Sequence, residues 1–310
     1  FDGLADNTAN AARIIAEDTD LTIFNELLRS CDEYGATAVT NENLELQADD
    51  AKTVFILAHW PVVRPRKLYD LQGTQIGSTT NPITVTYNSV ARSEYDGTGT
   101  QSAGTYYVIN YSLGEIYLVN QAGVVQTPAN GTAYTISYSY TTNVTKFDTD
   151  LGSDTTGIHW DKFLTSFGAA KTTISHSRYH NPNLGLMSET LMNSVEQAQS
   201  FAANYRRPGT ELLANGRLGT IKSVPIYDTP APGLWMADNR VLVGEMGVTR
   251  FRVAKPWALG MLENQKDSNG KFTGKKTAYG DQFIFVHTPT QLKKAYTSLV
   301  TYSASGRVAR

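Results

Sequence analysis

Cysteine is almost absent from this chain of 310 residues. Its single cysteine, Cys31, excludes an internal disulfide and any Cys-x-x-Cys metal or redox pair. A reducing compartment is the simpler expectation, because disulfides accumulate in oxidising ones. An excess of one charge is also missing, since 27 Lys and Arg stand against 29 Asp and Glu. We therefore expect neither a dedicated sequence-specific nucleic-acid binder nor an enzyme for acidic substrates.

Long apolar runs are missing as well. A membrane-spanning helix needs about 18 or more consecutive apolar residues, and the best candidate, residues 53–63, is interrupted by His59 and Pro61. The sequence predicts a soluble protein with no membrane partner. The chain begins with Phe1 and shows no basic and apolar secretion leader. Either a leader was removed, or the chain simply begins here.

Motifs for metal or nucleotide binding begin to form but stay incomplete. His176 and His180 have the four-residue spacing of two metal ligands on one helix, but Ser177 stands where a zincin requires Glu. Residues 270–277 have the glycines of a phosphate-binding loop, yet three residues separate them instead of four, and a strand is expected to follow. We expect a solvated, mobile loop at this position.

Signals for catalysis are no stronger. Asp148, Asp150 and Asp154 lie in a Thr- and Gly-rich linker, a composition more typical of a solvated loop than of acid/base machinery. Cys31 lies on the apolar stripe of an expected helix, where a core position is ordinary. The sequence thus offers no catalytic, cofactor-binding or metal-binding residues, and we expect a protein that is not an enzyme and has no cofactor.

The densest basic spot in the expected structured part is Arg64, Arg66 and Lys67. Two alternatives stay open. These side chains contact a neighbouring subunit or packaged phosphate, or they are simply the solvated side of a strand.

Two regions show helical periodicity. Residues 8–34 read as two helical pieces, because the cluster Asp18-Thr19-Asp20 interrupts the apolar stripe. Residues 189–207 read as one long helix, with apolar residues every three or four positions, Ser188 as its cap and Pro208-Gly209 beyond its end. About five turns would make this helix roughly 28 Å long.

Residues 83–140 alternate between apolar and polar side chains, which predicts β-strands. Turn dipeptides such as Leu113-Gly114 and Asn130-Gly131 separate the strands, so a small antiparallel sheet or sandwich is expected. The apolar positions of the alternation are Ile83, Val85, Tyr87, Tyr107, Ile109, Tyr111, Tyr134, Ile136, Tyr138 and Tyr140.

The order of these segments resembles the HK97-type major capsid protein of tailed bacteriophages. The phrase from Leu212 to Tyr227 indicates a glycine-marked turn, a small hairpin and a Pro-Ile-Tyr strand, and an apolar strand follows far downstream at 283–286. This combination is similar to the closing half of that family. The resemblance rests on the order of the segments and on their residue patterns, and it covers most of the chain outside residues 81–147.

The resemblance implies an α+β, HK97-like fold. Its parts would be an N-terminal arm of helices (1–50), an extended arm like the family's E-loop (51–80), an inserted antiparallel β-domain (81–147), a P-domain with a long spine helix (148–208 and 281–310) and an A-domain (209–280). The Phe1 start would fit removal of a leading segment by a maturation protease.

The resemblance also implies a function. The chain would be a major capsid protein that self-assembles into hexamers and pentamers of an icosahedral head enclosing double-stranded DNA. Its partners would be itself, packaged DNA without sequence preference, and scaffold, portal and decoration proteins. It would be located in the virion, after assembly in the host cytoplasm. Two alternatives stay open: another β-rich virion or surface protein, such as a tail tube or adhesin, and a hydrolase with a β-domain.

Overall fold

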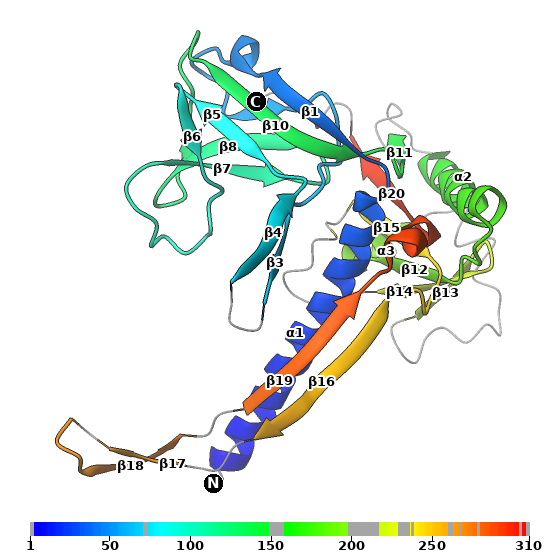
Figure 1. Cartoon of the computed structure of the whole chain (residues 1–310). Coiled ribbons are helices and arrows are strands. Elements are labelled where there is room, and N and C mark those ends of the chain that lie inside the picture. The colour runs from blue at the N-terminus through cyan, green and yellow to red at the C-terminus, as the bar shows by residue number, and fades with distance from the viewer. Residues whose placement is uncertain are drawn as a thin grey trace.

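The fold comprises three parts that meet at one helix: a β-sandwich lobe, a central sheet covered by helices, and a projecting arm (Figure 1). The structure is a computed structural model. It describes residues 3–70, 74–148, 158–197, 217–228, 236, 239–259, 263–266, 268–277, 280–303 and 306–307.

Three α-helices are described: α1 (Gly3–Glu33), α2 (Ile158–Thr172) and α3 (Glu189–Gln197). A π-helical turn, η2 (Thr173–Ser177), follows α2, and 3-10 turns form η1 (Glu45–Gln47) and η3 (Thr290–Ala295). The strands are β1 (Ala36–Asn43), β2 (Val54–Ile56), β3 (Arg66–Tyr69), β4 (Gln75–Thr80), β5 (Thr84–Tyr87), β6 (Val90–Arg92), β7 (Thr105–Asn110), β8 (Glu115–Asn120), β9 (Val125–Gln126), β10 (Tyr134–Thr141), β11 (Val144–Asp148), β12 (Leu184–Met187), β13 (Arg217–Ile221), β14 (Val224–Asp228), β15 (Arg240–Gly244), β16 (Arg250–Leu259), β17 (Glu263–Lys266), β18 (Phe272–Thr277), β19 (Gly280–His287) and β20 (Tyr296–Tyr302).

The sandwich lobe consists of two sheets that face each other across one core. One sheet has the order β1-β10-β5-β6, and the other has β2-β8-β7, with β9 paired to β8. Buried side chains recur at every second position in parts of β7 and β10, as the period of two predicts. The buried residues of both sheets form a single cluster that includes Phe55, Val85, Ile116, Tyr134 and Tyr138. The predicted strands between 83 and 140 are confirmed, and the structure adds β1 and β2 from before residue 81 to the same lobe.

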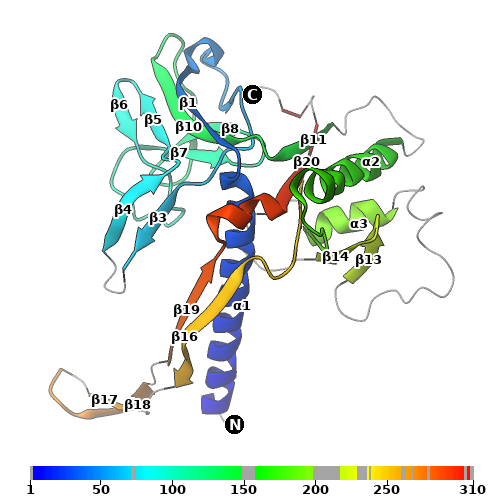
Figure 2. The same ribbon diagram turned by 45° about the vertical axis from the view of Figure 1, so that its right-hand side comes forward.

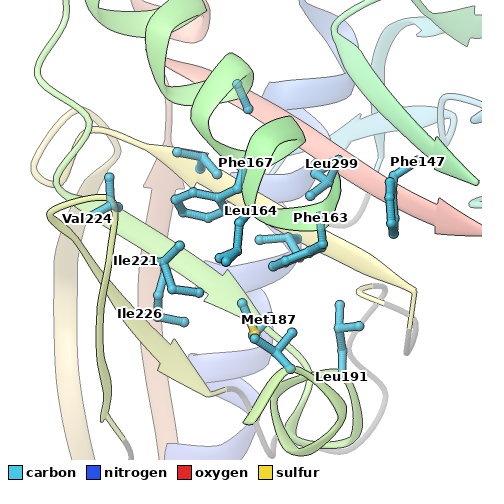
Figure 3. Packing of buried hydrophobic residues seen from close by; sticks show 14 of the residues in the cluster. Phe147, Phe163, Leu164, Phe167, Met187, Leu191, Ile221, Val224, Ile226 and Leu299 are labelled. Carbon is cyan, nitrogen blue, oxygen red and sulfur yellow. The ribbon is translucent and has the colours of Figure 1, made fainter. Parts of the chain in front are cut away.

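The central sheet is mixed and has the order β11-β20-β15-β12-β14-β13. Its middle strands are buried on both faces, because helices cover both sides. On one face, Phe163 and Phe167 of α2 and Leu191 of α3 pack with Val241 and Leu299 of the sheet (Figure 3). On the opposite face, Leu27, Leu28 and Cys31 of α1 pack with the other set of alternating residues, including Leu184, Leu242 and Tyr296.

The arm is the N-terminal half of α1 together with the hairpin of β16 and β19. These two strands pair with each other and with no further strand in the described part of the chain. The hairpin runs beside α1 away from the two lobes, and the small hairpin of β17 and β18 lies beyond its end (Figure 2). The arm has little core of its own, since α1 becomes buried only from Glu26 onward.

The last turn of α1 joins the parts of the molecule. Asp32 is buried and accepts a hydrogen bond from the guanidinium of the buried Arg240 in β15, which also donates to the Ser298 hydroxyl in β20. The carbonyl of Cys31 accepts a hydrogen bond of 2.8 Å from the side-chain amide of Asn143, at the point where the chain passes from the sandwich to the central sheet. Both contacts fix the direction in which α1 leaves the body.

The expected break in the N-terminal helix is wrong, because α1 runs without interruption across Asp18-Thr19-Asp20. The Thr19 hydroxyl donates to the carbonyl of Ile15, one turn earlier, at 2.8 Å. This bond satisfies the side chain within the helix. The two Asp side chains are exposed on this solvated stretch of helix, so they too can remain helical.

The expected HK97-like fold with a long spine helix is also wrong. The described chain is rich in strands arranged in six sheets, and its long helix is α1 at the N-terminus. The Ser188 cap is confirmed, since its hydroxyl accepts the Leu191 N–H at 3.2 Å. However, α3 is described only to Gln197, and the rest of the predicted 189–207 helix lies outside the described residues. A short strand in a loop-rich region was the expectation for residues 240–244, and they form β15, but inside a six-stranded sheet. The short segment expected at 291–302 contains another strand of that sheet, β20.

For residues 212–227, the predicted hairpin is correct, but the predicted place of that hairpin in the fold is wrong. Residues 217–228 do form a hairpin, β13 and β14, with Lys222 and Ser223 at positive φ in its turn. This hairpin extends the central sheet and does not begin a separate axial lobe. Residues 283–286 were expected to return to the domain of the spine helix, but they belong to β19 in the arm.

We predict that Arg240→Ala destabilises the protein by about 3–5 kcal/mol, because it leaves the Asp32 carboxylate buried without its cation. Burial raises the pKa of Asp32, and Arg240 opposes that rise. A raised native pKa makes stability fall as pH rises through it, and removing Arg240 raises this pKa further. The deficit in urea unfolding should therefore be larger at pH 8 than at pH 5. The exposed Arg252→Ala serves as the control, with a change within about 0.5 kcal/mol. Equal losses for both variants would contradict the role of the buried pair.

Candidate interaction surface

The hairpin of the arm has two chemically different faces, which its pairing register defines. Arg250 pairs with His287, Arg252 with Phe285 and, after a bulge, Lys255 with Phe283. Directly paired residues lie on the same face of an antiparallel sheet. These six side chains are all exposed. We call this set the basic–aromatic face: Arg250, Arg252, Lys255, Phe283, Phe285 and His287.

The opposite face of the hairpin is directed toward α1. Gln282 of β19 lies against a groove lined by Ala12, Ile15 and Thr19 of the helix, and the half-buried Ile284 and Val286 follow Gln282 at the period of two. The helix covers mainly β19. Phe251 and Val253, on the same face of β16, remain 44% and 45% exposed.

A groove separates the base of the basic–aromatic face from the hairpin of β3 and β4. It has a volume of about 520 Å³ and is more apolar than polar in its lining. Leu68 of β3 and Phe285 of β19 line it from opposite sides, and they are 54% and 55% exposed. Figure 2 shows the two hairpins on the same side of α1.

Charged side chains hold the wall of this groove in place. Arg66 of β3 donates to Glu33 at 2.7 Å and to Glu26 at 3.0 Å, and Lys293 of η3 also donates to Glu33. Burial alone would raise the pKa of Glu33, but the bonds from Arg66 and Lys293 outweigh it and hold that pKa below its ordinary value. Burial acts against the charge of Arg66, and the same carboxylates hold its pKa above the ordinary value. The β3–β4 hairpin is therefore clamped to the last turn of α1.

The three neighbouring cations Arg64, Arg66 and Lys67 have different surroundings in the structure. Arg66 takes part in this clamp, and the Arg64 guanidinium lies 3.9 Å from the centre of the Tyr111 ring. Burial lowers the pKa of Arg64. Lys67 is exposed. Two of the three cations, Arg64 and Arg66, thus serve contacts within the chain.

The two histidines do not share a helical face. His176 lies in η2, the helix ends at Ser177, and Tyr179 has a positive φ of 58°. The Nδ1 atom of His180 lies 2.6 Å from a carboxylate oxygen of Glu245. In the part of the chain that the structure covers, no three His, Cys, Asp or Glu side chains gather as a metal site.

The remaining candidates have structural surroundings. Residues 272–277 form β18, paired with β17, so the expected mobile loop at 270–277 is a hairpin. Cys31 is buried in the core as expected, and burial raises the pKa of its thiol to about 12. Asp148 ends β11, whereas Asp150 and Asp154 lie outside the described residues. No described helix is long and apolar enough to cross a membrane.

The sequence analysis missed the basic–aromatic face. The signal was available, since residues 250–255 alternate as Arg-Phe-Arg-Val before Lys255, and residues 283–287 read Phe-Ile-Phe-Val-His. Both patterns have the period of two of a strand with two distinct faces. The pairing of these two segments across about 25 intervening residues could not be inferred from either pattern alone.

We predict that Glu33→Gln lowers stability at pH 7 by about 1–3 kcal/mol, because Arg66 and Lys293 lose a charged acceptor. A lowered native pKa gives stability that is present above the unfolded pKa, near 4.3, and is lost as pH falls. The difference in Tm between variant and parent should therefore shrink between pH 6 and pH 3. Glu17→Gln, on the exposed part of the same helix, is the matched control with a loss below about 0.5 kcal/mol. A Tm difference independent of pH would contradict the clamp.

Comparisons with known proteins found only partial structural similarity, and no family. No family model matches the chain, and no curated protein matches it. One solved structure from a bacteriophage, Mycobacterium phage Ogopogo, is similar over 52% of this chain and 54% of that chain, with 17% identity and a TM-score of 0.32. The similarity thus spans about half of each protein. At this TM-score the similarity carries no argument about function.

Proposed function

We propose that this chain is a structural subunit of a virion, a major coat protein that self-assembles into the shell of a phage head around double-stranded DNA. In this proposal the chain is not an enzyme. The observation that carries it is the presence of projecting elements whose apolar side chains a single copy leaves uncovered.

The exposed apolar side chains are concentrated on the projecting elements. Of the 15 large apolar side chains that are exposed in the described chain, eight belong to α1, the β3–β4 hairpin or the β16–β19 hairpin. These eight are Ile14, Leu68, Tyr69, Ile76, Phe251, Val253, Phe283 and Phe285. Exposed apolar side chains that gather on one part of a protein mark an interaction surface, whereas isolated ones are ordinary.

Projecting hairpins suit assembly by repeated contacts. A shell subunit uses several moderate interfaces that symmetry repeats, so parts of each copy must reach its neighbours. The β3–β4 and β16–β19 hairpins are two-stranded sheets, and such a sheet alone in water is marginally stable at best. Covering their faces with another copy would bury apolar area and strengthen the hairpins at the same time.

The charge balance suits a wall that encloses DNA without binding it tightly, since the formal net charge is −2. Hexamers and pentamers, contacts with scaffold, portal and decoration proteins, and a place in the virion belong to the same proposal. They follow from a closed icosahedral shell, in which identical subunits occupy both kinds of ring.

We predict that the purified chain forms particles of megadalton mass and that Phe285→Asp abolishes them, because a charge replaces an apolar side chain on a surface that would be buried in assembly. Light scattering and negative-stain microscopy measure this directly. Leu46→Asp is the matched control, since Leu46 is 92% exposed on the sandwich lobe, away from the arm. Both variants should keep the parent's circular dichroism.

Three results would count against the proposal. A wild-type chain that stays monomeric at high concentration, even with a scaffold present, would reject self-assembly. Open tubes in place of closed shells would indicate a tail-tube protein. Equal loss of particles in Leu46→Asp and Phe285→Asp would show that the projecting hairpin has no special role.

A further inference from the structure

The two components of the arm carry opposite charge. Residues 250–287, which include the hairpin, contain seven Lys and Arg against three Asp and Glu. Residues 1–25, most of α1 before it enters the body, contain five Asp and Glu against one Arg. A nearly neutral chain therefore concentrates positive charge on the hairpin and the segment that joins its strands, and negative charge on the helix beside it.

The exposed side of α1 combines this negative charge with apolar side chains. Ile14, Glu17, Asp18 and Leu21 follow the spacing i, i+3, i+4, i+7, so they lie on one face of the helix. At 100° per residue this face is opposite to Ala12, Ile15 and Thr19, which face the hairpin. Ile14 is 60% exposed, and Glu17 and Asp18 are exposed as well. We call these four residues the acidic–apolar stripe.

The basic–aromatic face of the hairpin has the complementary composition. Arg250, Arg252 and Lys255 match the two carboxylates in sign, and the exposed Phe283 and Phe285 match Ile14 and Leu21 in apolar character. A copy cannot bring its own stripe to its own basic–aromatic face, because the two lie on opposite outer sides of the arm, with the helix–hairpin contact between them.

We propose that the basic–aromatic face binds the acidic–apolar stripe of α1 from a second copy of this chain. The bound helix would lie along the outside of the hairpin. Near the body, it would enter the groove between Leu68 and Phe285. Each hairpin would then have a helix on both faces, its own on one and a neighbour's on the other. This proposal rests on self-assembly as proposed above and adds the pair of surfaces that carries it.

The contact would be heterologous, because the two partners use different surfaces. A heterologous contact leaves one free hairpin face and one free stripe at the ends of every dimer, so it propagates until a ring closes. A ring of copies is the unit from which a closed shell is built. The opposite charges would also speed association and make it sensitive to salt.

The test uses the full chain with two charge reversals, Arg252→Glu and Asp18→Lys. Each alone places like charges at the contact and should weaken association at least about tenfold in analytical ultracentrifugation. Mixing the two variants in equal amounts should restore association, because unlike copies then offer only complementary contacts. Lys162→Glu, an exposed cation on α2, should leave association unchanged and serves as the matched control.

The outcomes separate this inference from the proposed function. If the wild-type chain assembles and both reversals assemble equally well, or if the mixture fails to recover, the inference is wrong while self-assembly stands. A wild-type chain that does not associate would overturn both. A labelled 30-nucleotide DNA provides the remaining arm of the test. If Arg252→Glu weakens binding of this DNA and leaves assembly intact, the face binds nucleic acid and the inference is wrong.

Discussion

The rest of the structure depends on the last turn of α1. Three consecutive residues there contact three different parts of the molecule: Cys31 through Asn143, Asp32 through Arg240, and Glu33 through Arg66 and Lys293. The sandwich lobe, the central sheet and the β3–β4 hairpin are thus all held in place by contacts with one helical turn. The direction of the arm follows from that turn, because the arm contains the same helix.

The chemistry of this turn explains why it is so restrictive. An apolar contact can slide or repack at little cost, whereas a buried carboxylate needs its cation at hydrogen-bond distance. Burial opposes the charge of Asp32, and the loss of either partner of a buried ion pair leaves an uncompensated charge. The alternation of side chains along β15 also fixes the position of this ion pair, because it sets which residues of the strand face α1. Leu242 faces α1, and Val241 and Val243 face α2, so a shift of one residue would remove Arg240 from Asp32.

The sequence predicted those parts of the fold in which one strand face is buried and the other is solvated. Tyr134, Ile136 and Tyr138 point into the sandwich as their period of two indicated. The hairpin at 217–228 was expected from the glycines of its phrase, although its turn is made by Lys222 and Ser223. The joining of the central strands into one sheet was missed because both faces of the middle strands are buried. Val241, Leu242 and Val243 give a continuous apolar run, which does not reveal that one side packs on α1 and the other on α2.

The candidate surface could be predicted only in part, for a different reason. The acidic character of residues 1–25 and the basic character of 250–287 are visible in the sequence. That these two segments lie side by side depends on the pairing of β16 with β19 and on the contacts of the last helical turn of α1. The resemblance to the HK97-type family led the reading toward a spine helix after residue 188. The long helix of the described structure is at the opposite end of the chain, and the predicted break at Asp18-Thr19-Asp20 does not occur.

In the proposed contact between copies, the same surface would link the stability of the arm to assembly. In one copy, α1 covers β19 but leaves Phe251 and Val253 of β16 exposed, and Phe283 and Phe285 on the outer face of the hairpin are exposed as well. A two-stranded sheet with so little packing gains stability from any partner that binds only its folded form, and the gain grows with the partner's concentration. At low concentration the arm would be the least stable part of the molecule. As copies accumulate, association would order the arm, and the ordered arm would in turn offer the next copy a complete surface.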